Sequence, residues 1–353
     1  MSVPTAFPFA VTGQSGALPS CGFGTATLFD DACATAVHEA IRVGVRAIDT
    51  ALLYNNQEAV GRGIRAAIAE GLVSRSDLFV TTKVAFFPAS HDGKNAWFPI
   101  KWHPENVKGE AATAAGVDLC LQLLGLDYVD LLLIHNPCTS LEDYTASSLP
   151  HEFELAGSRF DSEERKLVLA HRFAAVNVDL VAAEADRAAS WRALEAALAS
   201  GKAKYIGVSN YPAELIRSMA SYAKVMPAVN QLELHPRFAH PGLRAYAASA
   251  GMVLTAYGSG NSTQFSKSAV VARIAAERGC SPIAVVLRWT LQKGVAVIPR
   301  SASPAHMAAN LAVAASPPLT SSQVAEIDAL NENWPYYWHP APLFPRGTYT
   351  PDL

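Results

Sequence analysis

Four side chains of this sequence could together reduce a carbonyl group: Asp49, Tyr54, Lys83 and His135. A phenol has a pKa near ~10, so it is a poor acid at neutral pH unless a cation favours its ionised form. A lysine held by a carboxylate supplies such a cation, and we expect Lys83 and Asp49 to lower the pKa of Tyr54. His135 can donate a hydrogen bond that orients the carbonyl oxygen without supplying the proton. These residue types indicate reduction by hydride, with Tyr54 as the general acid.

Short apolar runs, typical of buried strands, alternate along the chain with amphipathic or alanine-rich stretches typical of helices. Strands are predicted at residues 22–25, 43–50, 77–84, 128–135, 203–209, 226–234, 252–257 and 295–299. Helices are predicted at residues 57–71, 107–124, 180–200, 212–223, 242–250, 282–292 and 303–315. Strict alternation implies parallel strands, and eight of them close into a (β/α)8 TIM barrel. Such barrels place their chemistry at the carboxyl ends of the strands, so the four side chains are expected to meet at one mouth.

The rest of the chain is interpreted as parts of the same domain, which is expected to span residues 1–353. Insertions at about residues 86–104 and 136–179 leave from the ends of the third and fourth strands, and an aromatic tail covers about residues 331–353. We expect the insertions to shape the mouth, although surface insertions of this length are also tolerated without a function. An open doubly wound sheet is the alternative fold, but residues 22–27 lack the third glycine of a GxGxxG motif.

Composition excludes several other classes of protein. The formal net charge of −3 gives no basic field for nucleic acid, and no apolar run reaches the roughly 18 residues of a membrane span. The five cysteines are scattered without a CxxC pair, and the amino-terminal residues lack a basic signal-peptide region. The histidines lack metal-ligand spacing such as HExxH, so no metal is expected. A cytoplasmic enzyme with free thiols is the prediction.

Six motifs, in order, resemble those of the aldo-keto reductase superfamily. They are AIDTALLYNNQEAVGRGI (residues 47–64), TTKV (81–84), LLIHNP (132–137), GVSNY (207–211), NQLELHP (230–236) and IPRSASPAHMAAN (298–310). One such motif is weak evidence, whereas six in family order over most of the chain are specific. The resemblance implies that Tyr54 is the acid, that Lys83 and Asp49 tune it, and that His135 positions the carbonyl. Structural roles are expected for Glu233 and His235.

The resemblance also implies a bound nicotinamide nucleotide. Its carboxamide is expected to meet Ser209, Asn210 and Gln231, its ring to stack on Tyr257, and its ribose side to lie near Thr25. Such fixed contacts present one face of the nicotinamide to the substrate. The cofactor-binding residues implied are Thr25, Asp49, Ser209, Asn210, Gln231, Tyr257, Arg300, Ser301, His306 and Asn310.

The motif for the adenosine 2′-phosphate departs from the family pattern. Arg300 replaces the usual lysine and keeps a permanent charge that can fork onto phosphate. His306 stands where a later arginine is usual, and it is mostly neutral at neutral pH unless phosphate holds its proton. We therefore expect NADPH to be preferred over NADH, with weaker discrimination than is usual in the family.

The substrate pocket departs further. Ala26, Ala85 and Asn136 stand where aldehyde-reducing relatives often have tryptophan, which should widen the pocket. Aromatic residues of the insertion and of the tail are expected to restore apolar walls, unless the tail packs on the barrel exterior. The predicted pocket residues are Ala26, Ala85, Phe86, Asn136, Trp97, Trp102, Trp334 and Tyr337.

The function expected from the sequence is NADPH-dependent reduction of an aldehyde or ketone to the alcohol, by a monomer or weak homodimer. Two alternatives are kept. A barrel could sense the nicotinamide nucleotide while binding a partner, with vestigial reductase activity, or it could be a hydrolase or lyase acting through other residues. Turnover of NADPH with carbonyl compounds separates the first alternative from the reductase, and nucleotide affinity separates the second.

Overall fold

The computed structural model describes residues 3–87, 103–139, 180–259 and 268–333 together with Pro335 and Tyr337. The greater part of both predicted insertions, with Trp97 and Trp102, lies outside the described residues, and so does Trp334 of the tail. Everything below concerns the described part of the chain.

Eight parallel strands follow one another around a barrel in the order of the sequence. They are β3 (Phe23–Gly24), β4 (Ala47–Asp49), β5 (Phe79–Val84), β6 (Val129–Ile134), β7 (Ala203–Ser209), β8 (Val229–Glu233), β9 (Val253–Tyr257) and β10 (Val295–Val297). A parallel bridge between Cys21 and Val297 joins the last strand to the first, and the N–H of Gly22 donates to the carbonyl of Val297 at 2.8 Å. The predicted (β/α)8 barrel is confirmed.

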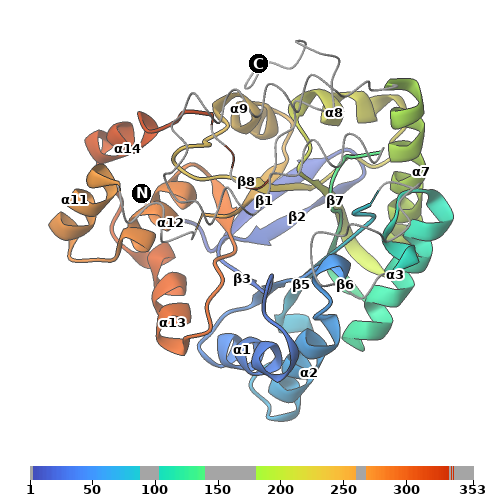
Figure 1. Ribbon diagram of the computed structural model, residues 1–353, viewed down its shortest axis with the longest axis horizontal. Helices are drawn as coiled ribbons and strands as arrows, with labels where there is room; N and C mark the ends of the chain where they lie inside the picture. Colours follow the sequence, from blue (N-terminus) through green and yellow to red (C-terminus); the bar gives the residue numbers. More distant parts are fainter. Residues whose placement is uncertain are drawn as a thin grey trace, which may run out of the picture.

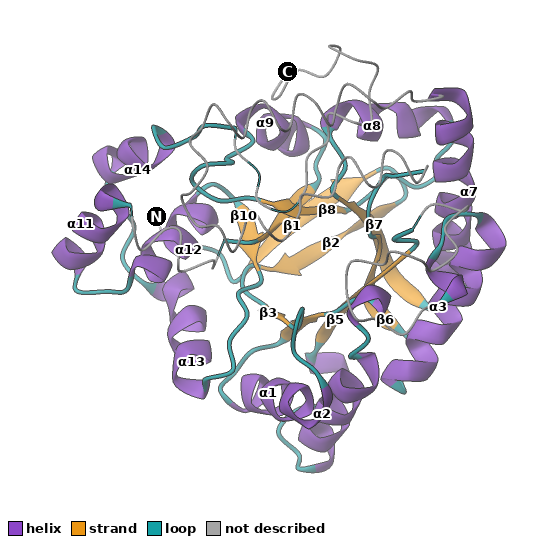
Figure 2. Ribbon diagram, viewed as in Figure 1, coloured by secondary structure: helices purple, strands orange, loops and turns teal. Residues whose placement is uncertain are grey.

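Helices surround the strands on the outside (Figures 1 and 2). They are α1 (Asp30–Arg42), α2 (Gln57–Ala69), α3 (Glu110–Leu124), α7 (Leu180–Ala199), α8 (Ala213–Ser218), α9 (Pro241–Ser249), α11 (Ala269–Arg278), α12 (Pro282–Gln292), α13 (Pro304–Ala312) and α14 (Ser321–Asp328). Each predicted helix has its counterpart within a few residues, whereas α1, α11 and α14 were not predicted. The start of α12 illustrates how the sequence fixes the beginning of a helix. The Ser281 hydroxyl accepts from the N–H of Ala284, and Pro282 occupies the first turn, where no N–H donor is needed.

An antiparallel hairpin that the sequence analysis missed precedes the barrel. Its strands are β1 (Ala6–Val11) and β2 (Gln14–Pro19), and Gly13 makes the turn with a φ of +85°. Backbone hydrogen bonds attach it to residues just before β8 and β9, which lie at the amino ends of those strands: Met226 N–H to Thr12 and Ala10 N–H to Gly251. The hairpin therefore closes the end of the barrel opposite the expected mouth.

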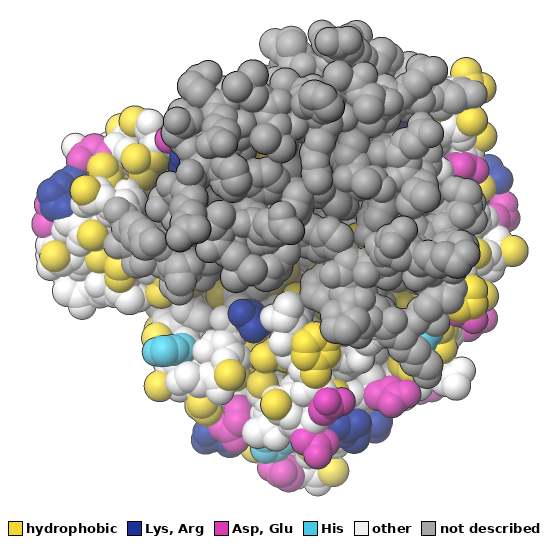
Figure 3. All heavy atoms as spheres, viewed as in Figure 1, with side chains coloured by type: hydrophobic (Ala, Val, Ile, Leu, Met, Phe, Trp, Pro, Cys, Tyr) yellow, Lys and Arg dark blue, Asp and Glu magenta, His cyan; other side chains and the backbone are white. Residues whose placement is uncertain are grey.

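Two sets of buried apolar side chains hold the barrel together. One lies between the strands and the helices and includes the fully buried Trp191 and Trp289. The other joins Phe9 and Leu18 of the hairpin to inward-facing residues such as Leu131. Over α1 and α2, charged side chains of both signs are mixed on the surface (Figure 3). No helix in the described part of the chain is long and apolar enough to cross a membrane.

Candidate active site

The barrel brings the four predicted catalytic side chains to one end. Asp49 is the last residue of β4, and Lys83 lies next to the last residue of β5. His135 follows β6 directly, and its N–H donates to the carbonyl of Val84 at the end of β5. Tyr54 ends η1 (Leu52–Tyr54), a single helical turn between β4 and α2. Neighbouring parallel strands thus place groups far apart in sequence at the same mouth.

Lys83 is the centre of this arrangement. Its side chain is fully buried, and its Nζ donates to Asp49 Oδ1 at 2.6 Å and to the backbone carbonyl of Thr50 at 2.9 Å. The same nitrogen lies 3.4 Å from the hydroxyl oxygen of Tyr54 and 5.0 Å from the centre of its ring. A buried ammonium with a carboxylate partner can stabilise a phenolate beside it. This geometry is the one that the tyrosine chemistry requires.

The expected net lowering of the Tyr54 pKa is not found. Burial raises the pKa of Tyr54, and the Asp49 carboxylate adds to this, while Lys83 acts in the opposite direction. For Lys83, burial alone would lower the pKa, but Asp49 and Tyr54 outweigh it and the pKa is raised. Tyr54 therefore holds its proton in this form of the chain, and Lys83 holds its charge. Tyr54 can therefore act as a proton donor, and the Lys83 ammonium can stabilise the phenolate that forms when the proton leaves.

His135 is held neutral. Burial lowers its pKa well below the usual range, and the ammonium groups of Lys83 and Lys108 lower it further. Its ring lies edge-on to Tyr54 at 5.7 Å and to Phe86 at 4.7 Å between centroids. Nδ1 is buried and has no hydrogen-bond partner among the described residues, and a neutral imidazole carries one N–H donor. His135 can therefore donate a hydrogen bond to a carbonyl oxygen without acting as the acid.

The four residues expected at the nicotinamide lie on or directly after the next three strands: Ser209 ends β7, Asn210 follows it, Gln231 lies in β8, and Tyr257 ends β9. The Ser209 hydroxyl donates to the backbone carbonyl of Gln231 at 2.7 Å. Asn210 adopts a left-handed φ of +64°, and its Nδ2 donates to the carbonyl of His135 at 3.0 Å. Its Oδ1 accepts from the Tyr257 hydroxyl at 2.7 Å. The structure thus brings Ser209, Asn210, Gln231 and Tyr257 together beside the catalytic group.

Asp49 connects this group to the other members of the catalytic tetrad, which consists of Asp49, Tyr54, Lys83 and His135. Its Oδ2 accepts from Gln231 Nε2 at 2.7 Å, while its Oδ1 accepts from Lys83. Gln231 also carries a carboxamide oxygen within this buried group, and the Tyr257 ring is only partly buried. An amide oxygen and an aromatic face are the groups that a nicotinamide carboxamide and ring require, so the residues fit the nucleotide. Thr25 contacts the backbone of Asp49 and not its carboxylate. It is buried, and its hydroxyl donates to the backbone carbonyl of Asp49 at 2.9 Å.

The residues expected at the adenosine phosphate follow β10. Arg300 is exposed, and Ser301 and Asn310 are partly buried. His306 is exposed in the first turn of α13, whose N-terminus is capped by the Ser303 hydroxyl. Free N–H groups at a helix N-terminus together with an arginine favour a phosphate group. The chemistry of this end of the barrel therefore fits a phosphorylated nucleotide.

The described pocket residues divide into two groups. Phe86, Ala26 and Tyr337 are partly exposed, and the Tyr337 ring lies 6.0 Å from that of Tyr257. Ala85 and Asn136 are fully buried. The Asn136 amide is engaged by its neighbours, since Nδ2 donates to the Phe86 carbonyl at 2.7 Å. A direct contact of Asn136 with substrate stays a prediction.

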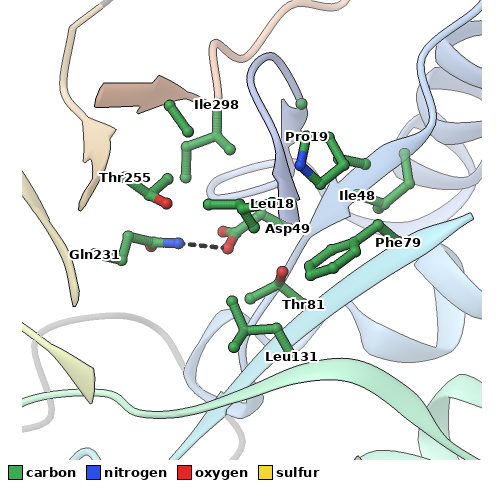
Figure 4. A pocket seen from close by; sticks show the side chains of 13 residues that line it. Leu18, Pro19, Ile48, Asp49, Phe79, Thr81, Leu131, Gln231, Thr255 and Ile298 are labelled. Atoms are coloured by element: carbon green, nitrogen blue, oxygen red, sulfur yellow. Dashed lines mark hydrogen bonds between the residues drawn. The ribbon is translucent and has the colours of Figure 1, made fainter. Parts of the chain in front are cut away.

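A small cavity lies inside the barrel behind Asp49, on the side toward the hairpin (Figure 4). It measures about 20 Å³, which is enough for one water molecule. Its polar walls are Asp49, Thr81, Gln231 and Thr255, and Leu18 and Pro19 of β2 line it from the hairpin. The close-up shows the Gln231 amide pointing at Asp49 across this space. The cavity therefore gives the buried carboxylate a partly polar surrounding.

Several residues of the site were missed in the sequence. Asn56 joins two mouth loops, because its Nδ2 donates to the carbonyls of Thr25 and Leu28 and its Oδ1 accepts from the Thr50 hydroxyl. Its position in the motif of residues 47–64 was the available signal. Lys108 is buried near His135 but follows an insertion, where a lysine looks like a surface residue. In the described residues no cluster of His, Cys, Asp or Glu has the arrangement of a metal site.

The fold and the site define a (β/α)8 oxidoreductase that reduces carbonyl groups with a nicotinamide nucleotide. The family model described as "Aldo/keto reductase family" matches residues 20–332, and the chain belongs to this family. It is 32% identical to an NAD(P)H-dependent D-xylose reductase of Scheffersomyces stipitis, over 93% of this chain and 96% of that protein. It is also 32% identical to an NADH-dependent D-xylose reductase of Candida parapsilosis, over 95% and 98% of the two chains.

Solved structures agree with this assignment. The crystal structure of a Bombyx mori aldo-keto reductase in complex with NADP superimposes with a TM-score of 0.69 and 27% identity, over 94% of this chain and 95% of that one. An aldo/keto reductase from Brucella melitensis superimposes with a TM-score of 0.68 and 26% identity, over 92% and 100% of the two chains. The predicted family and fold are confirmed, and the protein is an NAD(P)H-dependent reductase.

Proposed function

We propose that this protein reduces a sugar-like aldehyde to the alcohol with NADPH, and that Tyr54 is the general acid. The observation that carries the residue assignment is the position of Lys83 Nζ, within hydrogen-bond reach of both Asp49 and Tyr54. The names of the D-xylose reductases at 32% identity support a polyhydroxylated substrate. The replacement of tryptophans by Ala26, Ala85 and Asn136 supports a pocket wide enough for it.

Each residue of the site has a separate role in the reaction. NADPH supplies the hydride when it is bound. His135 donates a hydrogen bond from Nε2 and orients the carbonyl oxygen beside the Tyr54 hydroxyl. Tyr54 transfers its proton to that oxygen as negative charge develops on it, and Lys83 stabilises the phenolate that remains. Asp49 holds Lys83 in place and keeps it charged.

A spectrophotometric assay of NADPH oxidation tests the proposal. Pentoses and other hydroxyaldehydes, simple aliphatic aldehydes, bulky ketones and keto esters are compared at equal concentration. We expect the highest kcat/KM for a hydroxyaldehyde. Turnover confined to ketones contradicts the substrate class and leaves the chemistry intact. Nucleotide binding without turnover of any carbonyl supports the sensing protein instead.

We propose that NADPH is preferred to NADH only moderately, because His306 cannot match an arginine at the phosphate. His306→Arg adds a permanent, forked cation in the first turn of α13. A charge-assisted hydrogen bond contributes about 1.5–3 kcal/mol, so the ratio of Kd values for NADH and NADPH should rise by about ten-fold or more. Fluorescence titration with both nucleotides measures this. Ala308→Arg, on the same helix, is the control for charge alone, and an equal effect there contradicts the assignment.

We also propose that the protein works in the cytoplasm as a monomer or weak homodimer. The five cysteines are all free thiols, and four of them are buried, which suits a reducing compartment.

A further inference from the structure

A second buried lysine lies next to the active site without belonging to the tetrad. Lys108 follows η3 (Pro104–Asn106), and only 2% of its surface is exposed. Its Nζ donates to the backbone carbonyl of Ala85 at 2.7 Å and to Asn136 Oδ1 at 3.2 Å. Burial of an ammonium costs several kcal/mol, and such acceptors offset part of that cost. Both acceptors belong to mouth loops, so Lys108 joins the loop after β5 to the loop after β6.

Asn136 completes this connection from the other side. It is fully buried, and its Oδ1 accepts from Lys108 Nζ and from the N–H of Cys138 at 3.0 Å. Its Nδ2 donates to the backbone carbonyl of Phe86 at 2.7 Å. One amide therefore binds both loops through three hydrogen bonds. We call the Lys108–Asn136 pair the mouth latch.

The mouth latch determines where Phe86 lies. Its carbonyl is bound by Asn136, and its N–H donates to Asn106 Oδ1 at 3.1 Å. Fixed at both backbone groups, Phe86 presents its ring to the His135 ring at 4.7 Å, with an angle of 70° between the planes. Ala85, the residue before it, adopts a left-handed φ of +54°, which an alanine holds only when its surroundings enforce it.

We propose that the mouth latch positions Phe86 and His135 for the carbonyl substrate, which makes Lys108 and Asn136 positioning residues of the reaction. Phe86 then forms the wall against which the substrate lies while His135 orients its oxygen. This rests on the proposed function, because it assigns the latch to the same carbonyl site. The ring arrangement itself can be measured without turnover.

Lys108 also acts on His135 through its charge. The cations that disfavour protonation of His135 are Lys83 on β5 and Lys108, and Tyr54 lies edge-on to its ring as a neutral phenol. Removal of the Lys108 charge should therefore move the His135 titration to higher pH.

The first test is Lys108→Met in the full-length protein. NMR titration of the His135 imidazole should show a midpoint at higher pH than in the wild type. The KM for the carbonyl should rise, and kcat/KM should fall by about 10–100-fold, because a misplaced substrate reacts more slowly. The Kd for NADPH should stay the same. Lys202→Met is the control, since Lys202 is an exposed lysine paired with Asp118. A folded Lys108→Met protein with unchanged titration and KM overturns the proposal.

Asn136→Asp keeps the test decisive if Lys108→Met does not fold. Aspartate retains the oxygen that Lys108 and Cys138 bind, loses the donor to the Phe86 carbonyl, and cancels the Lys108 charge. We expect the same shift of the His135 titration to higher pH and a raised carbonyl KM. An unchanged titration in this variant contradicts the latch. If neither wild type nor variants reduce any carbonyl, the proposed function fails, whereas the titration still decides whether the latch acts on His135.

Discussion

Tyr54→Phe should abolish carbonyl reduction while nucleotide affinity stays nearly unchanged. The substitution removes one hydroxyl that lies 3.4 Å from Lys83 Nζ and leaves the ring in place. Loss of a positioned general acid costs about 10²–10⁴-fold in rate. Single-turnover reduction with saturating NADPH isolates this loss, and fluorescence titration measures the Kd for NADPH.

The matched control is Tyr205→Phe, which removes a hydroxyl at the hairpin end of the barrel, where the Tyr205 ring packs against Phe9 and Phe79. It should keep wild-type turnover. A Tyr54→Phe protein that reduces carbonyls at more than about a tenth of the wild-type rate would assign the proton to another group.

Lys83→Met should remove activity and also destabilise the fold. It leaves the Asp49 carboxylate buried with its ammonium partner gone, and loss of one member of a buried pair costs about 3–5 kcal/mol. Denaturation by urea, followed by circular dichroism, gives the free energy of unfolding. The carbonyl assay on the same sample gives the activity.

A double variant separates the two effects. In Lys83→Met/Asp49→Asn no uncompensated charge remains, and the new amide oxygen can still accept from Gln231. We expect it to recover most of the lost free energy of unfolding and none of the activity. Recovery of turnover would show that the charge of Lys83 has no part in the chemistry.

The barrel and the meeting of the tetrad could be predicted from the sequence for one physical reason. Parallel strands buried on both faces are continuous apolar runs, as in residues 128–135, and their carboxyl ends share one edge. Once the strands were placed, Asp49, Lys83 and His135 had to lie together. The hairpin was missed because its two strands alternate weakly and find their apolar surroundings only inside the finished barrel.

The allocation of hydrogen bonds could not be predicted. The sequence did not show that the Gln231 amide nitrogen binds Asp49 or that the Asn136 amide binds the Phe86 carbonyl. Such partners come from strands and loops remote in sequence. The net pKa of Tyr54 was misjudged for a related reason: the charge of Lys83 can be read from the residue type, whereas the larger effect of burial depends on the folded surroundings.

Asp49 accepts one hydrogen bond from Lys83, the cation beside Tyr54, and another from Gln231, a residue proposed to bind the nicotinamide. In the proposed function, one carboxylate therefore contacts both the nucleotide site and the group that supplies the proton. The two sites cannot be redesigned independently. The free energy by which nucleotide binding changes the protonation of Tyr54 equals the free energy by which protonation of Tyr54 changes nucleotide binding.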